Sequence, residues 1–229
     1  KKFESMAESK DKLVVAYWDV QALAQPIRWL LAYHKIDFED KQYKYADKTE
    51  WAEKDKPALN SDFPNLPHIK DGDFVITETV AVLQYAALKT GNKDLLGKNP
   101  LDAIKLSQLY SFTNDMFSNM RTLVLNKDYD KVRDEVLNEK IAPFLTKLSK
   151  NLGEKEYFAG YLTWVDFYIF TQIDVIRRMS PEFLAKWPNL EKYHERFNNS
   201  EGIQAYRKSD KHPKFWGPPA FLAWSGEEK

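Results

Sequence analysis

Apolar and polar positions along the chain follow two different patterns, with the change near residue 100. In the first pattern, residues 13–17 form a short apolar run that predicts a buried strand. Residues 36–43 alternate apolar and charged side chains, as a second strand would. Between them, Pro26 opens a stretch, residues 27–34, whose apolar side chains recur at helical spacing. A strand, a crossover helix and a second strand of this length predict a βαβ unit with parallel strands.

The rest of this first part predicts a short helix around Trp51 and then a hairpin. Residues 68–70 and 74–76 are the two strands, and Asp71-Gly72 between them favours a tight turn. Thr77 is expected to cap the following helix. The apolar face of that helix is expected to carry Val80, Leu83, Gln84 and Ala87. The order βαβ and then ββα predicts a compact mixed sheet with helices against it.

The second pattern is helical throughout. After residues 97–100, a linker by composition, apolar positions repeat at helical spacing over residues 101–125 and again over 132–152. In the first of these helices the expected apolar positions are Leu101, Ile104, Leu109, Phe112, Met116, Met120 and Leu123. Pro143 is expected to bend or split the second helix, because proline lacks the N–H that a helix interior needs.

A third helix is expected after Thr163. Thr163 and Asp166 have the spacing of a capping box, directly before an apolar stretch that should lie at the centre of a bundle. The predicted fold class is therefore an α/β domain followed by an all-α helical-bundle domain. The predicted domains are a polar N-terminal extension at 1–12, the α/β domain at 13–93 and the all-helical domain at 101–229.

Composition excludes several classes of function. The 34 basic and 34 acidic residues balance, which argues against nucleic acid or an anionic membrane as a partner. No apolar stretch approaches the roughly 18 residues that a membrane span needs. The chain has no cysteine, so disulfides, thiol nucleophiles and thiolate metal sites are excluded together, and no metal site is predicted. The first eleven residues lack the apolar core of a signal peptide, and Met6 among them suggests that residues 1–5 are a remnant of cloning.

Three short stretches carry residues with recognisable chemistry. They are Tyr17-Trp18-Asp19-Val20 after the first strand, Phe63-Pro64-Asn65-Leu66-Pro67 before the Asp71-Gly72 turn, and Thr77-Glu78-Thr79 at the start of a helix. Together they resemble the cytosolic glutathione transferases, and the mu class or a mu-like group in particular. The resemblance runs from Leu13 to about Trp224 and includes Phe158-Ala159-Gly160 and Trp187-Pro188-Asn189-Leu190.

The resemblance implies a thioredoxin-like α/β domain and a cytoplasmic, homodimeric enzyme. Its expected function is detoxification, by conjugating the thiolate of reduced glutathione to hydrophobic electrophiles, with glutathione as cosubstrate and no cofactor or metal. Neither nucleic acid nor a membrane is an expected partner. Two alternatives remain: a glutathione-dependent isomerase such as a prostaglandin D synthase, and a non-catalytic glutathione-binding or structural protein on the same scaffold.

Tyr17 is the expected catalytic residue. A cysteine thiol has a pKa of about 8.5, so only a few per cent of it is the nucleophilic thiolate at neutral pH. A hydroxyl that donates a hydrogen bond to the sulfur favours the charged form and lowers that pKa. Tyrosine suits this role because its own pKa of about 10 keeps it a donor at pH 7.

The resemblance also implies the other glutathione contacts. They are Trp18, Leu23, Lys48, Trp51, Lys54, Asn65, Leu66, Pro67, Glu78, Thr79 and, towards the neighbouring subunit, Asp115. The bond before Pro67 is expected to be cis, and the main chain of Leu66 to pair with the glutathione backbone. Glu78 and Thr79 replace the usual glutamine–serine pair at a helix N-terminus, where the γ-glutamyl carboxylate is expected. Lys54 and Lys56 are both candidates for a lysine that contacts the glycyl carboxylate.

An electrophile pocket and a dimer contact complete the expected site. The pocket residues are Val20, Leu23, Asn114, Ser118, Arg121 and Leu125, together with the tail from Trp216 to Trp224. Leu125 stands where many mu enzymes have a tyrosine that assists some electrophiles. Phe63, an apolar ring in a loop, is the expected aromatic key that inserts into the partner subunit.

Overall fold

The computed structural model describes residues 12–227 of the chain. The interpretation of residues 1–5 as a remnant, and most of the predicted extension, lie outside the described residues. The chain forms two compact units. The first holds the described residues up to Lys93 together with Glu201–Lys214, and the second holds Asp94–Ser200 with the described residues from Phe215 onwards.

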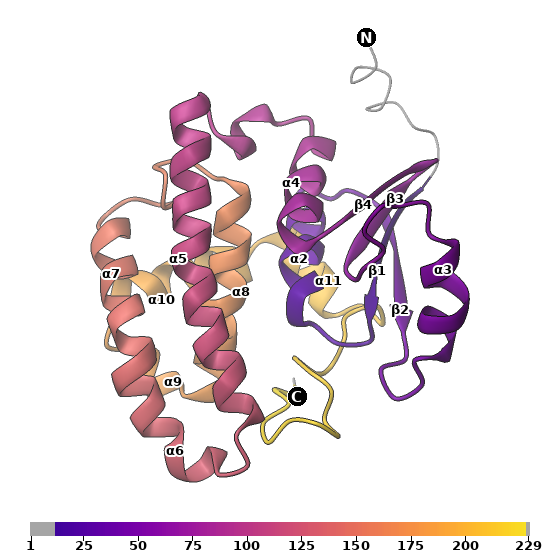
Figure 1. Ribbon diagram of the computed structural model, residues 1–229. Helices are drawn as coiled ribbons and strands as arrows, with labels where there is room; N and C mark the ends of the chain where they lie inside the picture. The colour runs from indigo at the N-terminus through magenta and orange to yellow at the C-terminus, as the bar shows by residue number, and fades with distance from the viewer. Residues whose placement is uncertain (1–11, 228–229) are drawn as a thin grey trace. The chain divides into compact units, whose positions relative to one another are not determined.

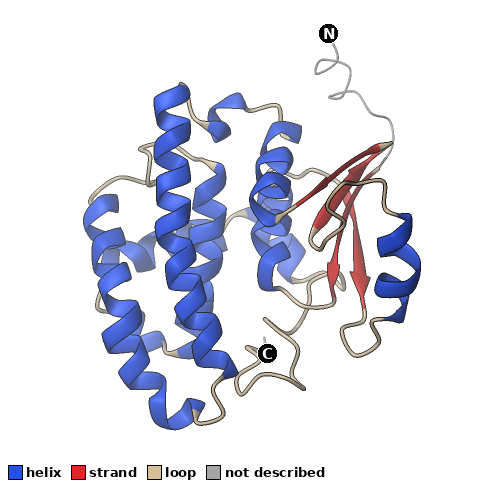
Figure 2. Ribbon diagram, viewed as in Figure 1, coloured by secondary structure: helices blue, strands red, loops and turns tan. Residues whose placement is uncertain are grey.

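The first unit is built on one four-stranded sheet in the order β2-β1-β3-β4 (Figure 2). Its strands are β1 (Leu13–Trp18), β2 (Phe38–Tyr43), β3 (His68–Asp71) and β4 (Phe74–Thr77). β1 pairs parallel with β2, with Val15 opposite Asp40, whereas β3 pairs antiparallel with both β1 and β4. The turn from β3 to β4 has Gly72 at φ 59°, a left-handed conformation that glycine adopts without strain. The predicted βαβ and ββα order is confirmed.

Helices of the first unit connect and cover these strands (Figure 1). They are η1 (Ala22–Ala24), α2 (Gln25–Tyr33), η2 (Glu50–Asp55), α3 (Lys56–Ala58), α4 (Thr79–Lys89) and α11 (Glu201–Arg207). α2 packs against α4, and α4 contacts β3 and β4. The short helical segment expected around Trp51 is confirmed as η2, a π-helical turn that continues into α3.

Two expectations about α4 are wrong. Thr77 does not cap the helix but ends β4, and the N-cap residue is Glu78, at φ 70° and without a side-chain cap hydrogen bond. The buried face consists of Val82, Leu83, Ala86 and Ala87, whereas Val80 and Gln84 are half-buried. Residues 80–83 and 86–88 are all apolar, so the helical period alone does not fix which of them face the core.

α11 reaches the first unit from the far end of the chain and packs against α2. Gly202 permits this close approach, because a Cβ atom at that position would lie 2.0 Å from the carbonyl oxygen of Ala32. No sequence pattern indicates this packing, since the contact joins residues far apart in the chain.

The second unit is helical (Figure 1). The short helix η3 (Lys93–Leu96) leads into it, and its helices are α5 (Pro100–Leu125), α6 (Tyr129–Val136), η4 (Leu137–Ile141), α7 (Ala142–Leu152), α8 (Trp164–Met179), α9 (Pro181–Leu184) and α10 (Pro188–Asn198). Asn99 caps α5 by accepting a hydrogen bond from the backbone N–H of Asp102. The predicted break near Pro143 is confirmed, since the π-helical turn η4 separates α6 from α7. Together with the α/β unit, this helical unit confirms the predicted fold class.

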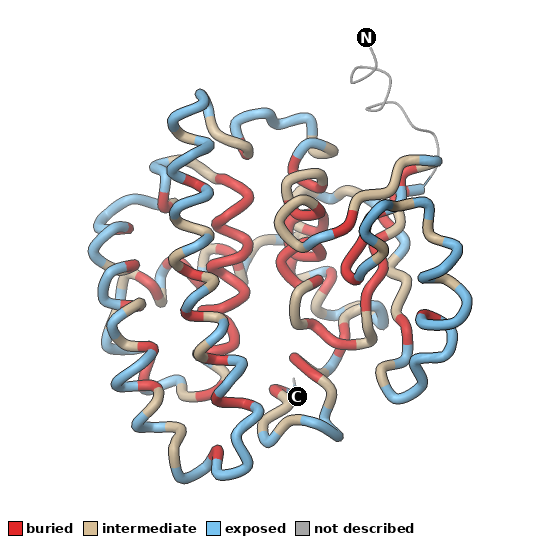
Figure 3. Tube along the Cα trace, in the orientation of Figure 1, coloured by how far each residue is buried: buried red, intermediate tan, exposed pale blue. Residues whose placement is uncertain are grey.

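α8 forms the core of this unit, as its apolar sequence predicts (Figure 3). Of its 16 residues, 14 are buried, and the capping box of Thr163 and Asp166 starts it. α5 follows its predicted pattern only from its middle onwards. Leu101 and Ile104 at its start are 59% and 65% exposed.

Candidate active site

Tyr17 lies near the end of β1 and is 6% exposed. It belongs to an apolar cluster that gathers predicted glutathione contacts from separate parts of the first unit. The buried members are Ala16, Tyr17, Val20, Ala24, Tyr43, Trp51 and Leu66, with Trp18, Ala22, Leu23 and Leu59 packed against them. The fold therefore places Tyr17 in one cluster with Trp51 and Leu66, residues that the sequence alone relates only through the resemblance.

The segment before β3 carries a cis peptide bond between Leu66 and Pro67, as expected. Asn65 links this segment to α4. Its side-chain oxygen accepts a hydrogen bond from the backbone N–H of Leu66 at 2.9 Å, and its amide nitrogen donates to Oε1 of Glu78 at 3.0 Å. Two stretches predicted to bind different parts of one tripeptide are thus joined directly.

The start of α4 offers an environment for an anion. Thr79 is its first residue and is half-buried, and Glu78 before it is exposed. The first backbone N–H groups of a helix have no partner within the helix, and the helix dipole adds positive potential there. Glu78 adds an exposed carboxylate next to this terminus, so the local surface can contact both a carboxylate and an ammonium group.

Trp51 is held between two rings that sequence reasoning did not identify. Its ring centroid lies 5.4 Å from that of Tyr43 on β2 and 5.7 Å from that of His68 on β3, where the rings are stacked. Desolvation by burial lowers the pKa of His68 to about 4, against the opposing hydrogen bond with the backbone of Asn65. His68 is therefore a neutral ring at pH 7.

Tyr43 is itself fastened by a charged pair. Its hydroxyl donates to Oδ2 of Asp55 at 2.8 Å, and Nζ of Lys41 lies 2.5 Å from the same oxygen. Desolvation by burial and the bond to Asp55 raise the pKa of Tyr43 to about 12. The hydrogen bond from Lys41 lowers the pKa of Asp55. The pattern of alternation in β2 was the one signal that could have indicated Lys41 and Tyr43 on the same face.

The remaining predicted contacts in the first unit lie near this cluster or at the surface. Trp18 packs edge-on against Tyr43 and Tyr45, and Nζ of Lys48 lies 4.5 Å from the centroid of the Tyr45 ring. Lys54 and Lys56 are both exposed.

The predicted electrophile and subunit contacts of the second unit lie along α5. Asn114 is half-buried, and its side-chain oxygen accepts a hydrogen bond from the hydroxyl of Tyr168 at 2.9 Å. Ser118 and Arg121 are exposed, and Leu125 is 45% exposed. Asp115 is also exposed.

The C-terminal tail folds back on the end of α5. The backbone N–H of Ala223 donates to the carbonyl of Val124 at 2.9 Å, and Trp216 packs against Phe117 with ring centroids 6.1 Å apart. Trp224 stacks on Tyr129. The two tail tryptophans are thus part of the helical unit.

Across residues 12–227, no group of three or more histidine, aspartate or glutamate side chains could hold a metal ion. Over the same residues, no helix is long and apolar enough to cross a membrane.

Comparison with known families assigns both units. Residues 13–88 match the family model described as glutathione S-transferase, N-terminal domain, and residues 114–210 match the glutathione S-transferase, C-terminal domain. A glutathione S-transferase of Dermatophagoides pteronyssinus is 34% identical over 212 residues, which cover 90% of this chain and 94% of the relative. The chain belongs to the glutathione S-transferase family.

Other relatives of this transferase agree with that assignment. Glutathione S-transferase Mu 1 of Bos taurus is 33% identical over 216 residues, covering 92% of this chain and 95% of the relative. A solved rat structure described as hPGDS complexed with a quinoline superimposes with a TM-score of 0.74 at 25% identity, covering 90% of this chain and all of that one. The resemblance to the mu class and the thioredoxin-like fold of the first unit are confirmed.

Proposed function

We propose that this transferase conjugates the thiolate of reduced glutathione to hydrophobic electrophiles, with Tyr17 as the catalytic residue. The observation that carries the proposal is the cluster that brings Tyr17, Trp51 and Leu66 together at the end of β1. In it, a buried tyrosine lies next to residues suited to hold a tripeptide. Glutathione is the cosubstrate, and no other cofactor takes part.

The tripeptide would be held at three points in the first unit. The main chain of Leu66 pairs with the glutathione backbone as an added strand would. The helix N-terminus at Thr79 receives the γ-glutamyl carboxylate, while the carboxylate of Glu78 pairs with the α-amino group. The glycyl carboxylate contacts the indole N–H groups of Trp18 and Trp51, with Lys48 and Lys54 as nearby cations.

Tyr17 would act on the sulfur atom. Its hydroxyl donates a hydrogen bond that stabilises the thiolate, and the thiol proton passes to solvent. An electron pair of the sulfur then forms the new bond to carbon, and a leaving group such as chloride departs with the electron pair of the bond that breaks. Because one pKa unit corresponds to about 1.4 kcal/mol, one charge-assisted bond accounts for a shift of about one to two units.

The test is Tyr17→Phe, assayed with a chlorodinitrobenzene and by binding to immobilised glutathione. Turnover at pH 6.5 should fall about 10-fold to 100-fold while glutathione affinity changes little. The reason is that the hydrogen bond from Tyr17 stabilises the thiolate more than the neutral thiol. Tyr161→Phe is the matched control, since its hydroxyl bonds Asp102 in the other unit. Unchanged turnover in Tyr17→Phe would remove the catalytic assignment.

In the same family-based proposal, the electrophile contacts of the second unit are the α5 residues Asn114, Ser118, Arg121 and Leu125. For the first unit the resemblance implies Val20 and Leu23. Asn114, Ser118 and Arg121 are polar, which favours electrophiles that carry nitro or carbonyl groups. Arg121→Ala should raise KM for such an electrophile without changing KM for glutathione.

We also propose a homodimer in which Phe63 is the key. Phe63 is 72% exposed, an unfavourable position for an unpartnered ring. The second unit has a cavity of about 630 Å³ beside α5 and α7, lined in part by Leu106, Leu109, Phe112 and Leu148. These apolar side chains suit the phenyl ring of a second copy, although charged residues such as Lys105 and Lys147 also line the cavity. Asp115 on the same helix is then proposed to approach the neighbouring glutathione.

The isomerase alternative uses the same thiolate, so product analysis separates it from conjugation. The similarity to the rat hPGDS structure is the observation that favours testing it. A cytoplasmic location remains a prediction, which cell fractionation would check.

A further inference from the structure

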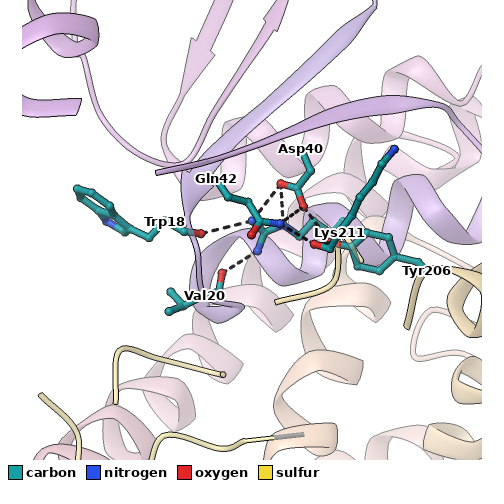
Figure 4. Close-up of polar contacts among 7 residues, drawn as sticks. Trp18, Val20, Asp40, Gln42, Tyr206 and Lys211 are labelled. Carbon is teal, nitrogen blue, oxygen red and sulfur yellow. Dashed lines mark hydrogen bonds and ion pairs between the residues drawn. The ribbon is translucent and has the colours of Figure 1, made fainter. Parts of the chain in front are cut away.

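The guanidinium of Arg28 is fully buried in the first unit, where it binds backbone carbonyl groups and a carboxylate. Arg28 lies on α2, and its side chain is 0% exposed. NH1 donates to the carbonyl oxygen of Val20 at 2.7 Å, and NH2 approaches that of Trp18 at 3.5 Å (Figure 4). These two carbonyls belong to Trp18, the last residue of β1, and to Val20 in the loop that follows it.

Asp40 on β2 holds this guanidinium in place. Its Oδ1 accepts from Nε of Arg28 at 3.1 Å and from NH2 at 3.0 Å, and its side chain is 1% exposed. Its second oxygen, Oδ2, accepts from the hydroxyl of Tyr206 and from the side-chain amide of Gln42, each at 3.0 Å. A buried carboxylate bound on both oxygens fixes the angle at which Arg28 meets the loop.

The segment Glu201–Lys214, which belongs to the first unit, extends this hydrogen-bond network. The amide of Gln42 also donates to the carbonyl of Lys211 at 2.5 Å. Gln21, within the loop itself, donates to the carbonyl of Pro213 at 2.8 Å. Figure 4 shows Asp40, Gln42, Tyr206 and Lys211 converging beside the backbone of Trp18 and Val20.

We propose that Arg28, Asp40 and Tyr206 are positioning residues that hold the loop after Tyr17, so that Glu201–Lys214 takes part in activating glutathione. This inference rests on the proposed function of Tyr17. Stabilising the thiolate requires the tyrosine oxygen and the sulfur to lie within hydrogen-bonding distance. A displacement of about 1 Å at such a site can lower the rate about 100-fold. A charged donor bound to the carbonyls on either side of Asp19 restricts that displacement.

Tyr206→Phe is the sharpest test, because it removes the hydroxyl that donates to Asp40 and leaves the packed ring in place. The ring lies 5.5 Å from that of Trp29 and 6.1 Å from that of Phe38. The readout is the apparent pKa of the bound glutathione thiol, taken from the pH dependence of kcat/KM for the electrophile at saturating glutathione. We expect this pKa to rise by about half a unit, with kcat/KM at pH 6.5 falling about threefold.

Asp40→Asn extends the series by removing the charge that holds Arg28. We expect a rise in the thiol pKa of about one unit and a fall in kcat/KM of about tenfold. Tyr161→Phe again serves as the control, since it deletes a hydroxyl bonded to Asp102 in the other unit. It should leave the thiol pKa unchanged.

Three outcomes are distinguishable when Tyr17→Phe is measured in the same assay. If Tyr17→Phe raises the thiol pKa and Tyr206→Phe raises it by a smaller amount, the positioning role holds. If Tyr17→Phe raises it but Tyr206→Phe lowers only the melting temperature, the residues are merely structural and the inference is overturned. If Tyr17→Phe leaves the thiol pKa unchanged, the proposed function itself fails, and with it the basis of the inference. Should Asp40→Asn not fold, Tyr206→Phe alone decides.

Discussion

His68 stacks on Trp51, with the ring centroids 5.7 Å apart and the ring planes 29° from parallel. The two residues come from β3 and from the turn η2, so this contact ties a proposed glutathione ligand to the sheet. The stacked ring is a neutral histidine whose pKa is lowered by burial. We therefore expect protonation of His68 in acid to disturb this contact.

Acid should destabilise the protein through His68, whose pKa of about 4 lies below the usual 6.5. Between these values the unfolded state binds a proton that the folded state does not, so the free energy of unfolding falls as the pH decreases. The loss from this group is about 2 kcal/mol between pH 7 and pH 5. His68→Phe keeps a ring on Trp51 and should remove this part of the loss, measured by urea unfolding at both pH values. An equally steep acid loss in the variant would contradict the prediction.

Asp166 should have the opposite pH dependence. It is fully buried, and burial raises its pKa to about 6, although hydrogen bonds from Thr163, Phe158 and Tyr193 oppose the shift. As the pH rises from about 4 to 6, the unfolded carboxyl loses its proton first, so this group's contribution to stability is lost.

The capping residue Thr163 offers a test of this arrangement. Thr163→Ala deletes a donor to the ionised carboxylate, at 2.7 Å from Oδ2, and should destabilise the protein by about 1 to 2 kcal/mol at pH 7.5. At pH 4.5, where Asp166 is largely protonated, the loss should be smaller. Thr122→Ala on the exposed face of α5 is the control and should change stability by less than about 0.5 kcal/mol. The measurement is the urea midpoint at each pH.

Glu78 should determine glutathione affinity without affecting turnover. Its carboxylate is exposed, accepts a hydrogen bond from Asn65 and is proposed to pair with the α-amino group. Glu78→Ala should raise KM for glutathione about 10-fold or more, and Glu78→Gln by less, with kcat nearly unchanged. Glu53→Ala, another exposed glutamate of the first unit, should leave KM unchanged. A fall in kcat with constant KM would refute the binding role.

The backbone at Glu78 offers a separate check. Its φ of 70° lies in the left-handed region, which costs a residue with a Cβ about 1 kcal/mol or more. Glu78→Gly should therefore be at least as stable as Glu78→Ala in thermal unfolding, although both lose the carboxylate.

Phe63 should control association. Phe63→Ser removes the exposed ring and should shift sedimentation towards a monomer at low micromolar concentration. Phe221→Ser is the matched control, since that ring is 60% exposed in the tail of the other unit. A dimer equally stable in both variants would show that Phe63 is not the key.

Local elements of the fold were predictable because their signals lie within a few residues of each other. The capping box of Thr163 and Asp166 places the start of α8, and Pro143 lies just after the break between α6 and α7. The errors concern α4. Glu78 rather than Thr77 is its N-cap, and because residues 80–83 and 86–88 are all apolar, the pattern did not settle which of them are buried.

The sequence predicted the residues proposed to contact glutathione better than it predicted the residues that hold them in place. Tyr17, Leu66 and Glu78 were named from motifs, whereas His68, Asp55 and Asp40 carry no motif of their own. Their roles come from contacts between strands and turns that the linear pattern does not relate. Asp40 in particular looks like a surface residue of an alternating strand, but its side chain is 1% exposed.

By itself, the sequence determined the order of strands and helices, the family, and the tyrosine that is proposed to act on the thiol. These follow from periodicity and short motifs, which depend on neighbouring residues. The tertiary structure alone decided that Glu201–Lys214 packs with the first unit and that Arg28, Asp40 and Tyr206 meet beneath the loop after Tyr17. The physical reason is that a buried charge must find its partners in space, and those partners lie up to 166 positions away in the chain.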